Sequence, residues 1–128
     1  MSQPHPRIRL EACLIDLERR VAIWPERERK LTENEAGLMA YLATHPNQTL
    51  TKETLLEEVW GYAAGVESRT TAVTIHRLRS KVEVDPKNPR HIVTVYGVGF
   101  RLEDAEILAS ASATSIGASR WWTNNAAP

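Results

Sequence analysis

The side chains best suited to a chemical role lie in one segment, residues 67–83, with the sequence ESRTTAVTIHRLRSKVE. At helical spacing, four apolar residues form a stripe that must pack against another element: Ala72, Ile75, Leu78 and Val82. A second face carries small side chains followed by long cations and contains no acid: Thr70, Val73, Thr74, Arg77 and Lys81. A helix in the major groove of DNA needs small residues at its leading end and a guanidinium that reaches a guanine edge or a phosphate. The segment therefore predicts a helix with one buried face and one face for DNA.

The distribution of charge supports this interpretation, although the whole chain has 16 basic and 16 acidic residues and a formal net charge of zero. A zero net charge by itself argues against a nucleic-acid binder. Between residues 67 and 102, however, seven Lys and Arg stand against three acids, whereas between 32 and 66 one Lys stands against five Glu. Positive charge is thus concentrated in one third of the chain, and a phosphate meets this local potential.

Other chemistries find no support in the residue types and their spacing. The histidines, at positions 5, 45, 76 and 91, and the single Cys13 lack metal-ligand spacing, so we expect no metal. The chain has no nucleophile–base pair and no phosphate-binding glycine loop, so we expect no enzyme, no cofactor and no small-molecule ligand. One cysteine excludes an internal disulfide and favours a cytoplasmic location. No apolar run approaches the ~20 residues of a membrane span, so we expect no membrane partner.

The elements that would position this helix are predicted from the chain on both sides of it. Residues 1–7 predict a flexible lead, and short stretches of strand character then predict a small antiparallel sheet: 8–10, 13–17, 21–24 and, more weakly, 28–30. Thr32 and Glu35 have the spacing of a capping box, which starts a first helix that Pro46 stops. A second helix is expected from Thr51, and Gly61 ends it.

The second half of the chain continues with a helix over about 68–84 and a hairpin over 92–102, since two strand-like stretches surround Gly97. Residues 103–128 are low in complexity and are typical of a disordered tail or a truncated linker. The fold class is therefore α+β: a small N-terminal antiparallel sheet, a three-helix core and a C-terminal β-hairpin. This order of elements is that of a winged helix.

Five pieces of sequence sharpen that interpretation, and their order and spacing are specific. They are Leu31-Thr-x-x-Glu-x-x-Leu-Met-x-x-Leu42, Leu55-Leu-x-x-Val-Trp-Gly61, Arg69, Ile75-x-Arg-Leu-Arg-x-Lys-Val-Glu83 and Thr94-Val-x-Gly-Val-Gly-Phe-Arg-Leu102. Together they resemble the OmpR/PhoB-type winged helix-turn-helix DNA-binding domain of bacterial transcriptional regulators. The resemblance covers residues 8–102 and implies sequence-specific binding of double-stranded DNA and regulation of transcription.

The resemblance also implies a role for individual positions. The third helix would lie in the major groove, with base contacts from Arg77, Val73, Thr70 and Thr74. Phosphate contacts would come from Trp60, Arg69, His76, Arg79, Lys81 and Thr94. The hairpin would be the wing, with Tyr96 and Gly97 near the minor groove. The loop between the second and third helices is used by some relatives to touch RNA polymerase; here it is Gly61, Tyr62, Ala63, Ala64, Gly65 and Val66.

Two residues depart from the pattern of the relatives. Many relatives carry an Arg just before the wing glycine, where this chain has the uncharged Tyr96. Ala72 stands where an Asp is common on the third helix. Both changes bear on DNA affinity rather than on the fold.

Three alternatives stay open at this point. The chain can be a stand-alone DNA binder, which on repeated half-sites would act as a homodimer or in tandem. Because only seven residues precede the first expected strand, no receiver domain is expected before it, and the chain can instead be the DNA-binding fragment of a longer regulator. The third alternative is a protein-interaction module with weak or no DNA affinity.

Overall fold

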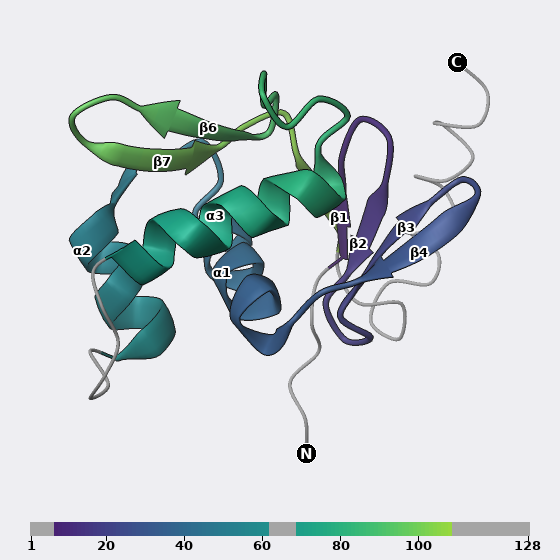
Figure 1. Ribbon diagram of the computed structural model, residues 1–128, viewed down its shortest axis with the longest axis horizontal. Coiled ribbons are helices and arrows are strands. Elements are labelled where there is room, and N and C mark those ends of the chain that lie inside the picture. The colour runs from purple at the N-terminus through teal and green to yellow at the C-terminus, as the bar shows by residue number, and fades with distance from the viewer. Residues whose placement is uncertain (1–6, 62–68, 109–128) are drawn as a thin grey trace.

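A sheet of short antiparallel strands opens the fold in the computed structural model, which describes residues 7–61 and 69–108 (Figure 1). Its strands are β1 (Arg7–Arg9), β2 (Leu14–Asp16), β3 (Val21–Trp24), β4 (Arg27–Lys30) and β8 (Glu106–Leu108), in the order β4-β3-β2-β1-β8. β8 pairs antiparallel with β1, so that Arg7 lies opposite Leu108. The strands of this sheet therefore continue to Leu108, whereas the sequence predicted a domain boundary at 102. Residues 1–6 and 109–128, and with them the expected lead and most of the expected tail, lie outside the described residues.

The first helix, α1 (Glu33–Ala43), begins where the sequence predicted it. The Thr32 hydroxyl accepts a hydrogen bond from the Glu35 backbone N–H at 3.1 Å, and the Glu35 carboxylate accepts one from the Thr32 N–H at 2.8 Å. This capping box satisfies two backbone donors that the first turn of a helix leaves without partners. Leu38, Met39 and Leu42 are fully buried, as the predicted stripe requires.

The second helix is irregular. It starts as α2 (Lys52–Leu55), capped by the Thr51 hydroxyl, and continues as a π-helical turn, η1 (Leu56–Trp60). It ends at Gly61, whose φ of +68° lies in the left-handed region that a glycine adopts without strain.

The third helix, α3 (Arg69–Val82), buries a stripe that differs from the predicted one. Its buried residues are Thr71, Thr74, Ile75, Leu78 and Val82, and Ala72 is exposed. The prediction for Ala72 was wrong because the stripe was drawn through apolar residues alone. The structure buries the aliphatic parts of two threonines instead.

Thr71 offers a stability prediction, because its hydroxyl is buried without a hydrogen-bond partner and the residue is 0% exposed. Replacing it by valine keeps the shape and removes the cost of a buried, unsatisfied polar group. We expect Thr71→Val to raise the free energy of unfolding by about 1 kcal/mol. Urea denaturation followed by circular dichroism measures this, and an equal or lower midpoint would show that the hydroxyl is satisfied in solution.

A second sheet forms the wing. β6 (Ile92–Val95) and β7 (Gly99–Leu102) make the predicted hairpin, and β5 (Leu50–Thr51) pairs with β7, giving the order β5-β7-β6. Gly97, with a φ of +78°, forms the turn. Gly99 has another reason to be glycine: a Cβ there would lie 1.9 Å from the carbonyl oxygen of Leu50, so only glycine lets β5 and β7 pair.

One hydrophobic core joins these parts. It takes residues from the first sheet, α1, α3 and the hairpin, including Ile8, Leu38, Ile75, Leu78 and Ile92. α3 runs along the length of the molecule, with the hairpin on one side, the N-terminal sheet near one end and α2 near the other (Figure 1). The predicted α+β winged-helix class is confirmed. No helix within 7–61 and 69–108 is long and apolar enough to cross a membrane.

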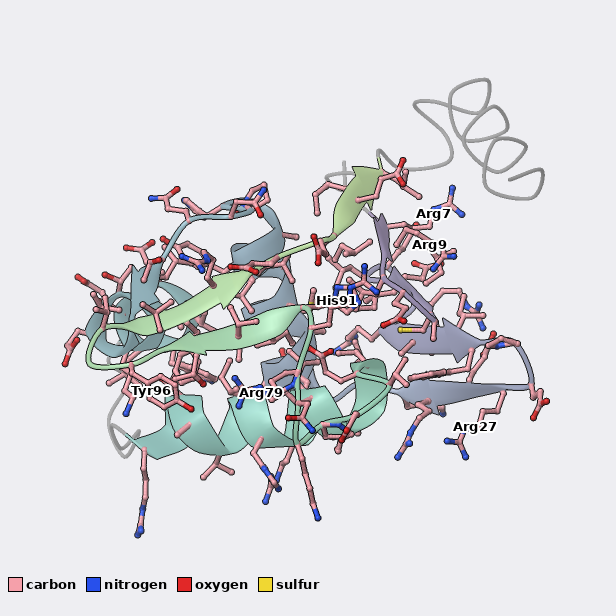
Figure 2. All side chains as sticks on the ribbon, turned by 90° about the horizontal axis from the view of Figure 1, so that it is seen from above. Arg7, Arg9, Arg27, Arg79, His91 and Tyr96 are labelled. Atoms are coloured by element: carbon pink, nitrogen blue, oxygen red, sulfur yellow. The ribbon has the colours of Figure 1, made fainter. Side chains whose placement is uncertain are left out.

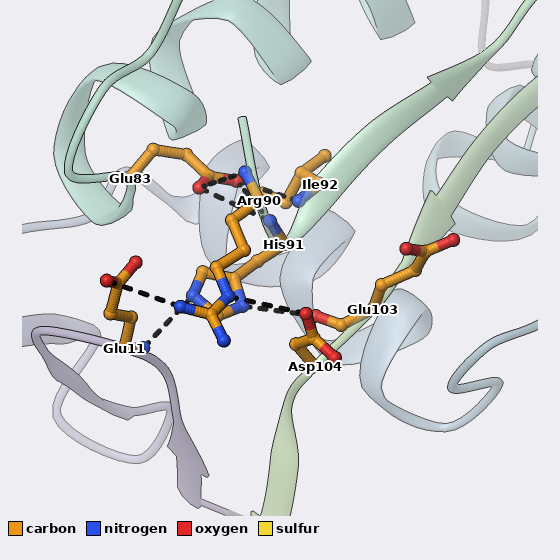
Figure 3. A network of polar contacts seen from close by, with 7 residues as sticks. All are labelled: Glu11, Glu83, Arg90, His91, Ile92, Glu103 and Asp104. Atoms are coloured by element: carbon orange, nitrogen blue, oxygen red, sulfur yellow. Dashed lines mark hydrogen bonds and ion pairs between the residues drawn. The ribbon is translucent and has the colours of Figure 1, made fainter. Parts of the chain in front are cut away.

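A polar junction fixes the hairpin to the end of α3 (Figure 3). The Glu83 carboxylate accepts hydrogen bonds from the backbone N–H groups of Arg90, His91 and Ile92 at 2.9, 3.0 and 2.7 Å. The His91 ring is buried and accepts from the Glu11 N–H at Nε2, at 3.0 Å, so its Nδ1 carries the proton and donates to the Glu103 carbonyl at 3.1 Å. The ring thus joins the N-terminal sheet to the end of the wing.

Two exposed ion pairs of Arg90 lie beside this junction. The Arg90 guanidinium lies 3.3 Å from a carboxylate oxygen of Glu11 and 3.3 Å from one of Asp104. The hydrogen bond to Asp104 and the charge of Glu11 raise the pKa of Arg90 above its ordinary value. Because these side chains are more than one-third exposed, solvent screens the attraction and its contribution to stability is small.

Candidate nucleic-acid interface

α3 presents one exposed face to solvent along its whole length. The exposed residues recur at steps of one, three and four: Arg69, Ala72, Val73, His76, Arg77 and Ser80. No acid lies in α3, so this face carries no negatively charged side chain. Figure 2 shows long side chains tipped with nitrogen projecting from this side of α3, away from the rest of the molecule. Such a convex, acid-free helix surface is suited to a groove lined by phosphates.

Arg77 is the best placed side chain for a base contact on this face. It is exposed, and its backbone carbonyl accepts a hydrogen bond from the Ser80 hydroxyl at 2.6 Å. Its guanidinium makes no hydrogen bond or ion pair with another residue in the described part of the chain. A guanidinium with all its donors unused can make the two parallel bonds that a guanine edge accepts.

The expected base contact from Thr74 conflicts with the structure. Thr74 is only 5% exposed and lies on the buried side of α3, one turn from Thr71 and Leu78. A side chain that packs on the core is poorly placed for a base edge, so the structure gives this predicted contact no support. Thr70 is half-buried at the border between the two faces, whereas Val73 is 42% exposed at the centre of the outer one.

Arg79 holds the wing instead of projecting to solvent. Its Nε donates to the Ile92 carbonyl and its Nη2 to the Thr94 hydroxyl, both at 2.8 Å. Its guanidinium carbon also lies 5.8 Å from the centre of the Phe100 ring. Burial lowers the pKa of Arg79, and the charge of Glu83 acts in the opposite direction. Figure 2 shows Arg79 between α3 and the hairpin. Arg79 and Thr94, which were both predicted to contact phosphates, are therefore hydrogen-bonded to each other.

Two other residues expected at phosphates are bound within the molecule. The Lys81 ammonium donates to the Lys30 carbonyl at 2.9 Å and to the Glu35 carboxylate at 2.7 Å. The Lys81 ammonium thus pairs with the buried Glu35 carboxylate of the capping box. Sequence spacing did not reveal that this carboxylate needs a positive partner. The Trp60 indole N–H donates to the side-chain oxygen of Asn34 at 2.9 Å. A phosphate contact of either residue would require these bonds to be exchanged.

The remaining predicted contact residues are at the surface. Arg69 and His76 are exposed on α3. Tyr96 is 91% exposed next to Gly97 at the tip of the wing. Of the predicted polymerase loop, Gly61 is described as the end of the second helix, and Tyr62, Ala63, Ala64, Gly65 and Val66 lie outside the described residues.

The described residues contain no group of three or more His, Cys, Asp or Glu side chains that could hold a metal ion. Cys13 is buried, and its Sγ–H donates to the Val82 carbonyl at 3.5 Å. Burial raises the pKa of this thiol to about 12, so Cys13 is a neutral core residue at physiological pH.

The fold and this helix face define a class of protein, the winged-helix DNA-binding domains. The model of the family described as "Transcriptional regulatory protein, C terminal" matches residues 26–102. The chain belongs to this family, which is the OmpR/PhoB-type winged-helix DNA-binding domain of transcriptional regulators and is not enzymatic. The resemblance noted in the sequence is thus confirmed, and the chain is a DNA-binding effector domain of a transcriptional regulator.

Solved structures agree with this assignment. The chain is 26% identical to the DNA-binding domain of Klebsiella pneumoniae RstA, solved in complex with the RstA box, with a TM-score of 0.62 over 76% of this chain and 96% of that one. It is 28% identical to the Thermotoga maritima OmpR/PhoB homologue DrrB, with a TM-score of 0.66 over 76% of this chain and 44% of that one. The DNA-binding domain of E. coli CadC, 22% identical, shares the fold with a TM-score of 0.68 over 81% of this chain and 98% of that one.

Proposed function

We propose that this domain reads double-stranded DNA through the major groove, with α3 as the reading helix and Arg77 at a guanine edge. The observation that carries the proposal is the exposed, acid-free face of α3, on which the Arg77 guanidinium makes no hydrogen bond or ion pair with any described residue. The RstA domain, which shares this fold, was solved with its DNA box. That precedent supports DNA as the ligand of this domain.

Phosphate contacts would supply most of the affinity and position the helix. Arg69 and His76 are exposed on the α3 face, and Thr94 and Tyr96 extend the surface onto the wing. Val73, at the centre of the face, would meet a thymine methyl group. We assign Lys81 and Trp60 a supporting role, because both already hold other parts of the molecule.

We extend the proposal to assembly on DNA, to a protein partner and to the location of the protein. One module of this size reads few bases, so we expect dimeric or tandem binding on repeated half-sites. We also propose contact between RNA polymerase and the segment after Gly61, and a cytoplasmic location, where the DNA is. The chain spans 44% of the length of DrrB, and we also propose that it is the DNA-binding part of a longer regulator.

One observation favours a second function, a protein-interaction module. The wing tip carries no charge: Tyr96 is 91% and Val98 50% exposed, and the chain has zero net charge. An exposed apolar tip of this kind is suited to a protein partner.

A salt titration of the whole chain on duplex DNA separates the two functions. With DNA binding, the logarithm of the affinity falls linearly with the logarithm of salt concentration, with a slope of about −0.9 for each phosphate neutralised. Arg77→Ala should weaken binding and reduce the difference between base sequences by about 1–3 kcal/mol, because it removes a base contact. Arg69→Ala should weaken all sequences alike. Negligible binding at low salt would support the interaction module, and equal loss of preference in both variants would contradict the assigned roles.

A further inference from the structure

We infer that Ala72 is a specificity-determining residue, which together with the hollow beside it accepts the 5-methyl group of a thymine. The inference rests on the proposed function, since it concerns the same face of α3. The sequence pattern placed Ala72 in the buried stripe of the helix, whereas the structure exposes it.

The position of Ala72 gives the first reason. Ala72 and Val73 are consecutive exposed residues one turn before His76 and Arg77. Together they form a small apolar patch on an otherwise polar helix face, adjacent to the proposed guanine-reading residue. Neither side chain has a hydrogen-bonding atom, so neither can read a base edge except through its only apolar group, the thymine methyl.

The surroundings of Ala72 give the second reason. A hollow of about 280 Å³ lies between α2 and α3 and is lined by Lys52, Glu53, Leu56, Arg69 and Ala72. Leu56 and Ala72 supply apolar surface, whereas the two cations and one carboxylate bring a net positive charge to its border. A thymine methyl fits against the apolar part, and the positive border suits the phosphates that flank the same nucleotide.

The chemistry also says what the site would reject. A cytosine presents an amino donor where thymine presents its O4 acceptor, and it lacks the methyl group next to it. Against the Ala72 methyl, that amino group would lose its water without gaining an acceptor, which is unfavourable. An aspartate at position 72 would instead accept from the cytosine amino group, so the residue type at this position selects between the two pyrimidines.

The test uses the whole chain and removes only the methyl groups from DNA. Preferred duplexes are first selected from a random library, and each thymine of a preferred duplex is then replaced singly by deoxyuridine, which pairs identically. Fluorescence anisotropy gives the ratio of the two Kd values at each position. Burial of one methyl group corresponds to about a fourfold effect, so we expect two neighbouring thymines to show ratios of about three to five with the unchanged chain.

Paired variants assign each thymine to a side chain. Ala72→Gly should bring the ratio at one thymine to about 1 and leave the other unchanged, and Val73→Ala should reduce the ratio at the other thymine. A helix weakened by the glycine changes both Kd values of a pair equally and leaves the ratio intact. Ala72→Asp should shift the selected base at the first position from thymine to cytosine.

The outcomes separate this inference from the function on which it rests. A preferred duplex whose uracil ratios are all close to 1, or a ratio that survives in Ala72→Gly, overturns the role of Ala72 and leaves DNA recognition in place. A selection that returns no preferred duplex overturns both.

Discussion

Glu83→Ala should lower the free energy of unfolding by about 3–5 kcal/mol, because it leaves three backbone N–H donors, two of them buried, without an acceptor. Glu83 is only 4% exposed, so water cannot easily replace the carboxylate. An acid just after the end of a helix is unfavourable with respect to the helix dipole. The carboxylate is therefore held there by the three donors of the following strand. Thermal denaturation should show a Tm lower by at least about 12 °C for a domain of this size.

Two further variants make this stability prediction specific. Glu83→Gln keeps one acceptor oxygen and should lose less than the alanine variant. Glu57→Ala removes an exposed acid of the second helix and should change stability by no more than about 0.5 kcal/mol. If the alanine variants at 83 and 57 unfold at the same temperature, the junction drawn in Figure 3 does not organise the hairpin in solution.

Arg79→Met should weaken DNA binding about tenfold through the wing rather than through a lost phosphate contact. Two charge-assisted hydrogen bonds to β6 are removed, each worth roughly 1.5–3 kcal/mol before the exposed part is discounted for solvent. The hairpin then loses its fixed orientation relative to α3. Because Arg79 acts as a positioning residue, its effect should depend on the wing tip. In a Tyr96→Ala background the same substitution should cost clearly less affinity.

The matched control is Arg77→Met, which removes the same charge two residues away on the exposed face. Its effect should add to that of Tyr96→Ala, since Arg77 makes no hydrogen bond or ion pair with the wing among the described residues. A direct phosphate contact of Arg79 would give the opposite pattern: additivity with Tyr96→Ala and a salt slope smaller by about 1.

Much of the fold was predictable because it depends on local chemistry. The Thr32–Glu35 capping box, the left-handed Gly61 and the turn at Gly97 each act over a few residues, and each was found where the sequence placed it. β5 and β8 were missed because they are short and lack a local pattern. Leu50–Thr51 is a strand only because β7, almost fifty residues later, pairs with it across Gly99.

The site was less predictable than the fold, since the orientation of a helix depends on what it packs against. The residues of α3 were identified correctly as a group, but the predicted boundary between its buried and exposed faces was wrong by about one residue. Ala72 is exposed and Thr74 is buried, the reverse of the prediction. The roles of Arg79 and Lys81 were also hidden, because their partners lie on the wing and at the start of α1. A run of cations in a sequence does not reveal which of them are already hydrogen-bonded or ion-paired within the molecule.

The pairing of β8 with β1 determines where neighbouring domains can be attached. Arg7 and Leu108 lie opposite each other in the sheet, and Figure 2 shows Arg7 on the side of the molecule away from α3. Both ends of the described fold therefore lie away from the exposed face of α3 that we propose reads DNA. Only three residues separate β7 from β8. A force applied to the chain after Leu108 would therefore act on the base of the hairpin through a very short connection.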